Sequence, residues 1–128
     1  MSTIYKKTLS VLLALALLLG MTPVTASAEI PYTYNPAHIA VINDIIKNNG
    51  LNWTLAPVDG SSVPENWTGV MWTSDPFDEY VLRIQYLNLG NCNLTGTLNI
   101  NGLASLEYLY CDKNQLTKLI MPSPLPAR

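Results

Sequence analysis

The clearest hydrophobic pattern in the chain is a stripe of isoleucines at helical spacing. Its members, separated by steps of three and four residues, are Ile39, Ile42 and Ile46. This period places them on one face of an α-helix. Asn35 and Pro36 favour a helix start, and Gly50 suits the left-handed residue that ends a helix. The pattern therefore predicts one helix over about residues 36–49, with an apolar face that other residues must cover.

The next segment, residues 51–79, has little periodicity and contains all three tryptophans of the chain, Trp53, Trp67 and Trp72. Turn-forming residues occur at positions 59–62 and at Asp75–Pro76. We therefore expect short extended pieces and loops that are held in place by buried aromatic rings. Tryptophans in such a segment more often form a small core than a ligand site, so we interpret these three as core residues.

The segment that starts at Val81 has the same pattern of apolar residues as the segment that starts at Leu103. We call the distance along the sequence between these two copies the repeat offset. The matched pairs include Ile84 with Leu106, Leu87 with Leu109, and Leu94 with Leu116. Repeats of this length are typical of a solenoid, in which each repeat covers the apolar edge of its neighbour. A third copy would begin in phase at Leu125.

Each copy fits the pattern L-x-x-L-x-L-x-x-(N/C)-x-L. Its apolar residues alternate inward on a short strand. The residue at the N/C position then turns inward and satisfies backbone groups that the turn leaves unpaired. This residue is Cys92 in the first copy and Asn114 in the second. Because a thiol is a weak donor, we expect Asn114 to hold its turn better than Cys92.

With this motif the chain resembles the leucine-rich-repeat family. Residues 66–72, together with the helix at 36–49 and Trp53, look like the N-terminal caps of secreted repeat proteins, in which a helix and a Trp-x-Gly-Val strand cover the first repeat. Residues 103–117 are similar to repeats in secreted proteins of Gram-positive bacteria. The resemblance covers about residues 36–120. It implies an α/β fold, a leucine-rich-repeat solenoid with a short parallel β-sheet, an N-terminal helix and a tryptophan-rich cap.

We accordingly expect four segments along the chain. They are a signal peptide (1–28), an N-terminal capping region (29–80), two leucine-rich repeats (81–120) and a proline-rich tail or truncated third repeat (121–128). Two repeats are fewer than the three or so that a solenoid needs. Either the sequence is a fragment or a truncated gene product, or it is a small protein that uses a partner to cover Leu109, Leu116 and Ile120.

The segment 1–28 has the layout of a secretory signal peptide. Lys6 and Lys7 precede an apolar run of about 11 residues, and the small residues 26–28 form an Ala-x-Ala cleavage pattern. A membrane span would need ~20 apolar residues. We therefore predict cleavage after Ala28, a mature chain without a membrane span, and a secreted or cell-surface location.

Composition limits the chemistry of the mature chain. Without Lys6 and Lys7, five basic residues remain against all nine acidic ones, a formal charge of −4, which excludes a nucleic-acid partner. The only histidine, His38, is expected to lie on the helix surface or to pack in the cap. Cys92 and Cys111 stand at unlike positions of adjacent repeats, which favours buried thiols over a disulfide. No catalytic set, metal-ligand spacing or cofactor motif is present, and we expect no enzyme.

The candidate functional residues lie on the outward face of the predicted strands: Tyr86, Asn88, Tyr108, Tyr110 and Asp112. With strands about 4.8 Å apart, Tyr86 should lie beside Tyr108 and Asn88 beside Tyr110. Such residues suit recognition of a protein or of a cell-wall or host glycan, and they suit equally well the simpler role of keeping a sheet in solution. The sequence thus predicts an exported binding module. The alternative is a structural spacer, or a fragment of a larger multidomain surface protein whose activity lies elsewhere.

Overall fold

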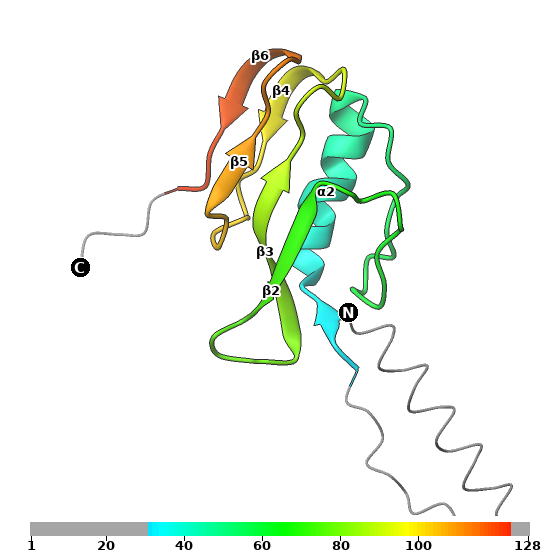
Figure 1. Cartoon of the computed structure of the whole chain (residues 1–128), viewed down its shortest axis with the longest axis vertical. Coiled ribbons are helices and arrows are strands. Elements are labelled where there is room, and N and C mark those ends of the chain that lie inside the picture. Colours follow the sequence, from blue (N-terminus) through cyan, green and yellow to red (C-terminus); the bar gives the residue numbers. More distant parts are fainter. Residues whose placement is uncertain (1–30, 124–128) are drawn as a thin grey trace, which may run out of the picture. The chain divides into compact units, whose positions relative to one another are not determined.

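A computed structural model describes residues 31–123 of the chain (Figure 1). The expected signal peptide (1–28) lies outside the described residues, as does most of the expected proline-rich tail, at residues 124–128. The described part contains one α-helix and six β-strands, which form two small sheets.

The helix α2 (Pro36–Asn49) has the bounds that the sequence predicts. The side-chain oxygen of Asn35 accepts hydrogen bonds from the backbone N–H of Ala37 and of His38, at 2.9 and 3.4 Å, and so satisfies two of the unpaired donors of the first turn. Gly50 has φ of 76°, the left-handed conformation that ends a helix. The prediction of this helix is confirmed, because its start, its stop and its apolar stripe are all local signals.

The larger sheet is built around β3 (Val81–Asn88). This strand pairs in parallel with β1 (Thr33–Tyr34) and with β5 (Tyr108–Tyr110), and antiparallel with β2 (Val70–Ser74). The second sheet has two parallel strands, β4 (Thr95–Asn99) and β6 (Gln115–Ile120). In Figure 1, β4 and β6 lie side by side, and α2 lies next to the strands, partly behind β2.

The predicted fold class, an α/β leucine-rich-repeat solenoid with a parallel sheet, is wrong. The sheets are small and mixed, and β2 pairs antiparallel with β3. The physical reason is the connection between these strands, which is the turn at residues 75–80. A parallel crossover needs about a dozen residues or more, whereas a tight turn returns the chain alongside itself. The backbone N–H of Asp75 donates to the carbonyl of Val81 at 2.8 Å and closes this turn.

Strand pairing follows the repeat offset in one sheet but not in the other. In the larger sheet, Leu87 of β3 lies opposite Leu109 of β5, which is the predicted repeat offset. In the smaller sheet, Thr95 lies opposite Gln115 and Leu98 opposite Leu119, with a register shift after Gly96. The sequence match of Leu98 with Ile120 therefore does not become a strand pair.

A bulge in β3 changes which side chains face inward. Trp72 of β2 pairs with Ile84, but its neighbour Met71 pairs with Tyr86, so Gln85 has no partner in β2. An extra residue of this kind reverses the alternation of side chains along the strand. As a result Ile84 and Leu87 are both buried, although they are three residues apart.

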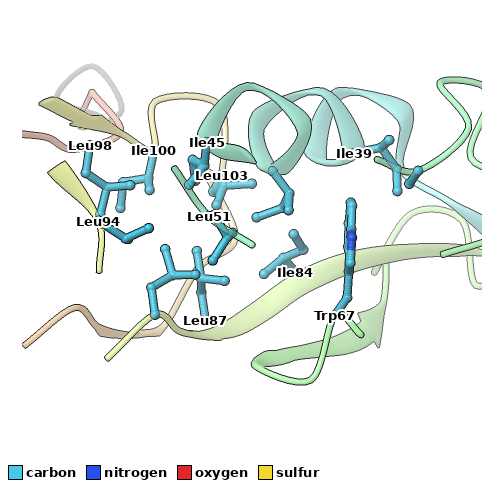
Figure 2. Close-up of a cluster of buried hydrophobic side chains, with 13 residues drawn as sticks. Ile39, Ile45, Leu51, Trp67, Ile84, Leu87, Leu94, Leu98, Ile100 and Leu103 are labelled. Carbon is cyan, nitrogen blue, oxygen red and sulfur yellow. The ribbon is translucent and has the colours of Figure 1, made fainter. Parts of the chain in front are cut away.

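One apolar core joins the helix to both sheets, and from Thr33 onward the described chain clusters into one compact unit. Figure 2 shows the side chains of Ile39 and Ile45 from α2 on one side of this core, with Ile84 and Leu87 of β3 opposite. All four are at most 1% exposed. Burying one such side chain contributes about 1.5–3 kcal/mol relative to leaving it in water.

The tryptophans of the irregular segment belong to this core, as the sequence predicts. Trp67 is buried, and Trp53 and Trp72 pack against the buried cluster. The rings of Trp53 and Trp67 stack with centroids 6.2 Å apart. The indole N–H of Trp67 donates to the carbonyl of Thr54 at 2.7 Å, so the polar atom of the buried ring has its partner.

Candidate binding surface

The strand register brings four of the five predicted site residues together on one sheet. Tyr86 lies opposite Tyr108, and Asn88 lies opposite Tyr110, as the repeat offset predicts. Directly opposed residues of neighbouring strands project from the same face of a sheet. The core residue Leu87 lies between Tyr86 and Asn88 in the strand and points to the other face. The pairs Tyr86–Tyr108 and Asn88–Tyr110 therefore face away from the core.

The three tyrosine rings form one continuous group. The ring centroid of Tyr86 lies 6.4 Å from that of Tyr108 and 5.6 Å from that of Tyr110, and both pairs are tilted. Tyr108 is 55% exposed and Tyr110 49% exposed, whereas Tyr86 is half-buried between its neighbours. These distances lie within the range of aromatic pairs that attract one another. The group therefore holds its own arrangement while presenting two rings to the solvent.

Met71 extends this surface onto β2. It lies opposite Tyr86 across the sheet and is 58% exposed. Sequence reasoning missed it, because residues 51–79 show no long periodic pattern. The available signal was the short alternation in which Met71 falls between Val70 and Trp72, both of which pack against the core. We call Met71, Tyr86, Asn88, Tyr108 and Tyr110 the tyrosine face.

Polar side chains border the tyrosine face. The amide nitrogen of Gln85, in β3, donates to Oε2 of Glu107, the residue just before β5, at 2.8 Å. Within the face itself, the amide of Asn88 donates to the hydroxyl of Tyr86 at 3.4 Å. The predicted site residue Asp112 follows β5 and is exposed, and a side chain on Gly90 would come within 2.8 Å of its Oδ1. Carboxylates thus stand at both ends of β5.

Asn114 fixes the turn that follows β5, as predicted. Its Oδ1 accepts from the backbone N–H of Cys92 and of Leu94, both at 3.0 Å. Its amide nitrogen donates to the carbonyls of Leu89, Cys111 and Asp112, at 2.7, 3.0 and 3.1 Å. One side chain therefore joins its own turn to the turn one repeat earlier.

Cys92 and Cys111 are both free thiols and both pack, half-buried, against the core. Cys92 makes one weak side-chain hydrogen bond, from its thiol to the carbonyl of Gly90 at 3.4 Å. Burial raises the pKa of the Cys92 thiol above its ordinary value. Because the thiolate is the reactive form, a raised pKa makes this residue less suited to nucleophilic chemistry.

Of the two placements expected for His38, the structure has the packed one and not the helix surface, because the side chain is buried between α2 and β3. Its Nδ1 accepts a hydrogen bond from the backbone N–H of Ile84 at 3.0 Å. Burial lowers the pKa of His38, the positive charge of Arg83 lowers it further, and the negative charge of Asp75 opposes both. The neutral ring therefore serves as an acceptor for the backbone beside the bulge, which is a structural role.

A hollow lies between α2 and β4, with a volume of about 90 Å³. Its polar lining residues are Asp44, Asn48, Asn49, Thr97, Asn99 and Asn101. The amide of Asn49 is already engaged, because it donates to the carbonyls of Thr95 and Thr97 at 2.8 and 2.7 Å. This contact ties the last residue of the helix to β4.

Within residues 31–123 there is no group of three or more histidine, cysteine, aspartate or glutamate side chains that could hold a metal ion. In the same part of the chain, no helix has both the length and the apolar character needed to cross a membrane.

Comparisons of the chain with protein-family models, with curated proteins and with solved structures found no match. The resemblance to leucine-rich-repeat proteins therefore rests on the sequence motif alone.

Proposed function

We propose that this protein is an exported, non-enzymatic binding module that contacts a protein or a glycan through the tyrosine face. The observation that carries the proposal is the exposure of Tyr108 and Tyr110 beside Tyr86 and Met71, on a sheet surface that faces away from the core. Contiguous exposed apolar surface with a polar border is typical of interaction sites. Tyrosine and methionine are both enriched in such interfaces.

The layout of residues 1–28 supports export, since a positive start, an apolar run and an Ala-x-Ala pattern follow one another there. An exported module is exposed to proteins and glycans outside the cytoplasm. Both kinds of ligand can pack against the flat ring of tyrosine and form hydrogen bonds with its hydroxyl group.

The test compares two variants of the full chain on one panel of immobilised glycans and extracellular proteins. The first variant carries Tyr86→Ala, Tyr108→Ala and Tyr110→Ala. The control is Phe77→Ala, which removes an aromatic ring that is 97% exposed but lies in the turn between β2 and β3. We expect the triple variant to lose binding and the control to keep it. Binding that survives the triple substitution, in a protein whose circular dichroism is unchanged, contradicts the proposal.

A structural spacer within a larger surface protein is the second candidate. It is favoured by apolar side chains along β6 and just beyond it, where Leu119 is 41% and Met121 53% exposed. A spacer would pack these side chains against a neighbouring segment. Substituting Leu119 and Met121 by Ser would then raise the stability or solubility of the isolated chain without changing any binding by the tyrosine face.

A further inference from the structure

The strand β5 has an open edge beside the tyrosine face. Among residues 31–123, β5 pairs only with β3, and no strand lies along its other edge. The carbonyl of Tyr110 accepts from the backbone N–H of Leu89 at 2.6 Å, so Tyr110 directs its backbone toward β3. Successive residues of a parallel strand direct these groups to opposite edges. Leu109 therefore directs its N–H and its carbonyl to the open edge.

We propose that the partner is a protein segment with a basic, extended sequence, which adds to this edge as a further strand. The inference rests on the proposed function and specifies the ligand of the same surface. Strand addition is a common mode of peptide recognition, in which main-chain hydrogen bonds give affinity and alternate side chains give specificity. A glycan cannot form a strand ladder with the N–H and the carbonyl of Leu109, whereas the backbone of a peptide strand can.

Charge indicates the sequence of the added strand. Glu107 precedes β5 and Asp112 follows it closely, and both are exposed. Lys113, the next residue in the turn, is a basic neighbour in sequence. Another strand with an open edge, β6, contains the exposed Lys118 and no acidic residue. A basic segment is therefore attracted to β5 and not to β6.

The spacing of the tyrosine face fits alternate residues of such a strand. Side chains two residues apart on one face of a strand are separated by about 6.6 Å. Two arginines at this spacing can stack on Tyr108 and Tyr110, since a guanidinium is attracted to an aromatic ring. The exposed carboxylates of Glu107 and Asp112 flank these two tyrosines in the sequence, and their negative charge attracts the guanidinium groups.

The experiment measures the fluorescence anisotropy of a labelled peptide, Arg-Thr-Arg-Thr-Arg-Thr, during titration with the full chain. The matched peptides are Glu-Thr-Glu-Thr-Glu-Thr, which reverses the charge, and the arginine peptide with alternate N-methylated residues, which keeps the charge but cannot pair as a strand. We expect saturable binding of the first peptide alone. The combined variant Glu107→Gln and Asp112→Asn should weaken that binding about tenfold, and Lys118→Gln should not.

Several outcomes overturn the inference. The inference is wrong if the arginine peptide shows no saturable binding, or if the glutamate or N-methylated peptide binds equally well. It is also wrong if the Glu107 and Asp112 substitutions have no effect, or if the chain associates with itself through β5 and binds no peptide. If the arginine peptide fails but a glycan or another protein still binds in a tyrosine-dependent way, this inference is wrong and the proposed function stands. If substitution of the three tyrosines changes no binding at all, the proposed function fails as well.

Discussion

Asn114 is hydrogen-bonded to Cys92, the residue that occupies the same motif position one repeat earlier: its Oδ1 accepts the Cys92 N–H at 3.0 Å. The contact spans one full repeat offset and links the turns that follow β3 and β5. The asparagine thus stabilises two turns at once, whereas the cysteine contributes little through its side chain.

Replacing Asn114 by Ala should destabilise the protein by about 3 kcal/mol, because the substitution leaves several partly buried backbone groups without partners. These groups include the N–H of Leu94 and the carbonyl of Leu89. Urea unfolding followed by far-UV circular dichroism measures the change. Cys92→Ala is the matched control and should cost at most about 1 kcal/mol, since it removes one weak thiol hydrogen bond. Equal losses in the two variants would show that the asparagine network does not hold these turns.

Asn49→Ala should separate the end of α2 from β4. The buried amide of Asn49 is bonded to the carbonyls of Thr95 and Thr97, and its loss should cost about 2 kcal/mol. Asn48→Ala is the control, because Asn48 is exposed and should change stability by less than about 0.5 kcal/mol. Thermal unfolding of both variants measures the difference. Indistinguishable midpoints would rule out this contact as a link between the helix and the second sheet.

Gly69→Ala should be strongly destabilising, because a Cβ at this position would overlap the carbonyl of Asn88. The carbonyl of Gly69 also accepts from the N–H of Asn88 at 2.7 Å, so the two backbones cannot separate without losing this bond. We expect a loss of about 3 kcal/mol. The control Gly50→Ala has open space around the new methyl group and only a positive φ to strain, and should cost about 1 kcal/mol. A larger loss in the control would contradict the close-approach argument.

Stability should fall as the pH drops below 6.5, the ordinary pKa of histidine. Burial lowers the pKa of His38 in the folded protein, so the unfolded chain takes up a proton first as the pH falls. The contribution of neutral His38 to the free energy of unfolding is therefore fully present above pH 6.5 and is lost as the pH falls below this value. Protonation would also remove the acceptor for the N–H of Ile84. Urea unfolding at several pH values between 5 and 8, values that bracket this window, measures the effect.

His38→Asn provides the control for this pH dependence. An asparagine Oδ1 can accept the N–H of Ile84 but does not titrate in this range. We expect this variant to keep part of the stability and to lose the decline that we predict for the wild type below pH 6.5. A decline that persists unchanged in His38→Asn would assign it to other groups.

The sequence alone determined the features that depend on neighbouring residues or on the internal repeat. The helix from Pro36 to Asn49 follows from its cap, its apolar period and its terminal glycine. The side-by-side placement of Tyr86 and Tyr108 follows from the repeat offset, because a parallel pair of repeats keeps equivalent residues opposite one another. The role of Asn114 follows from the need to satisfy the backbone of a turn.

Tertiary structure decided the rest, including the fold class. The antiparallel pairing of β2 arises because the turn at residues 75–80 returns the chain alongside β3, whereas the repeat pattern, which starts at Val81, says nothing about the strand Val70–Ser74. The bulge at Gln85 exists because Ile84 and Leu87 must both reach the core, and it places Met71 on the tyrosine face. His38 is buried for a similar reason, since the N–H of Ile84 needs an acceptor there. Local signals set where elements begin and end, whereas burial and backbone pairing across the fold set which elements meet and which side chains remain exposed.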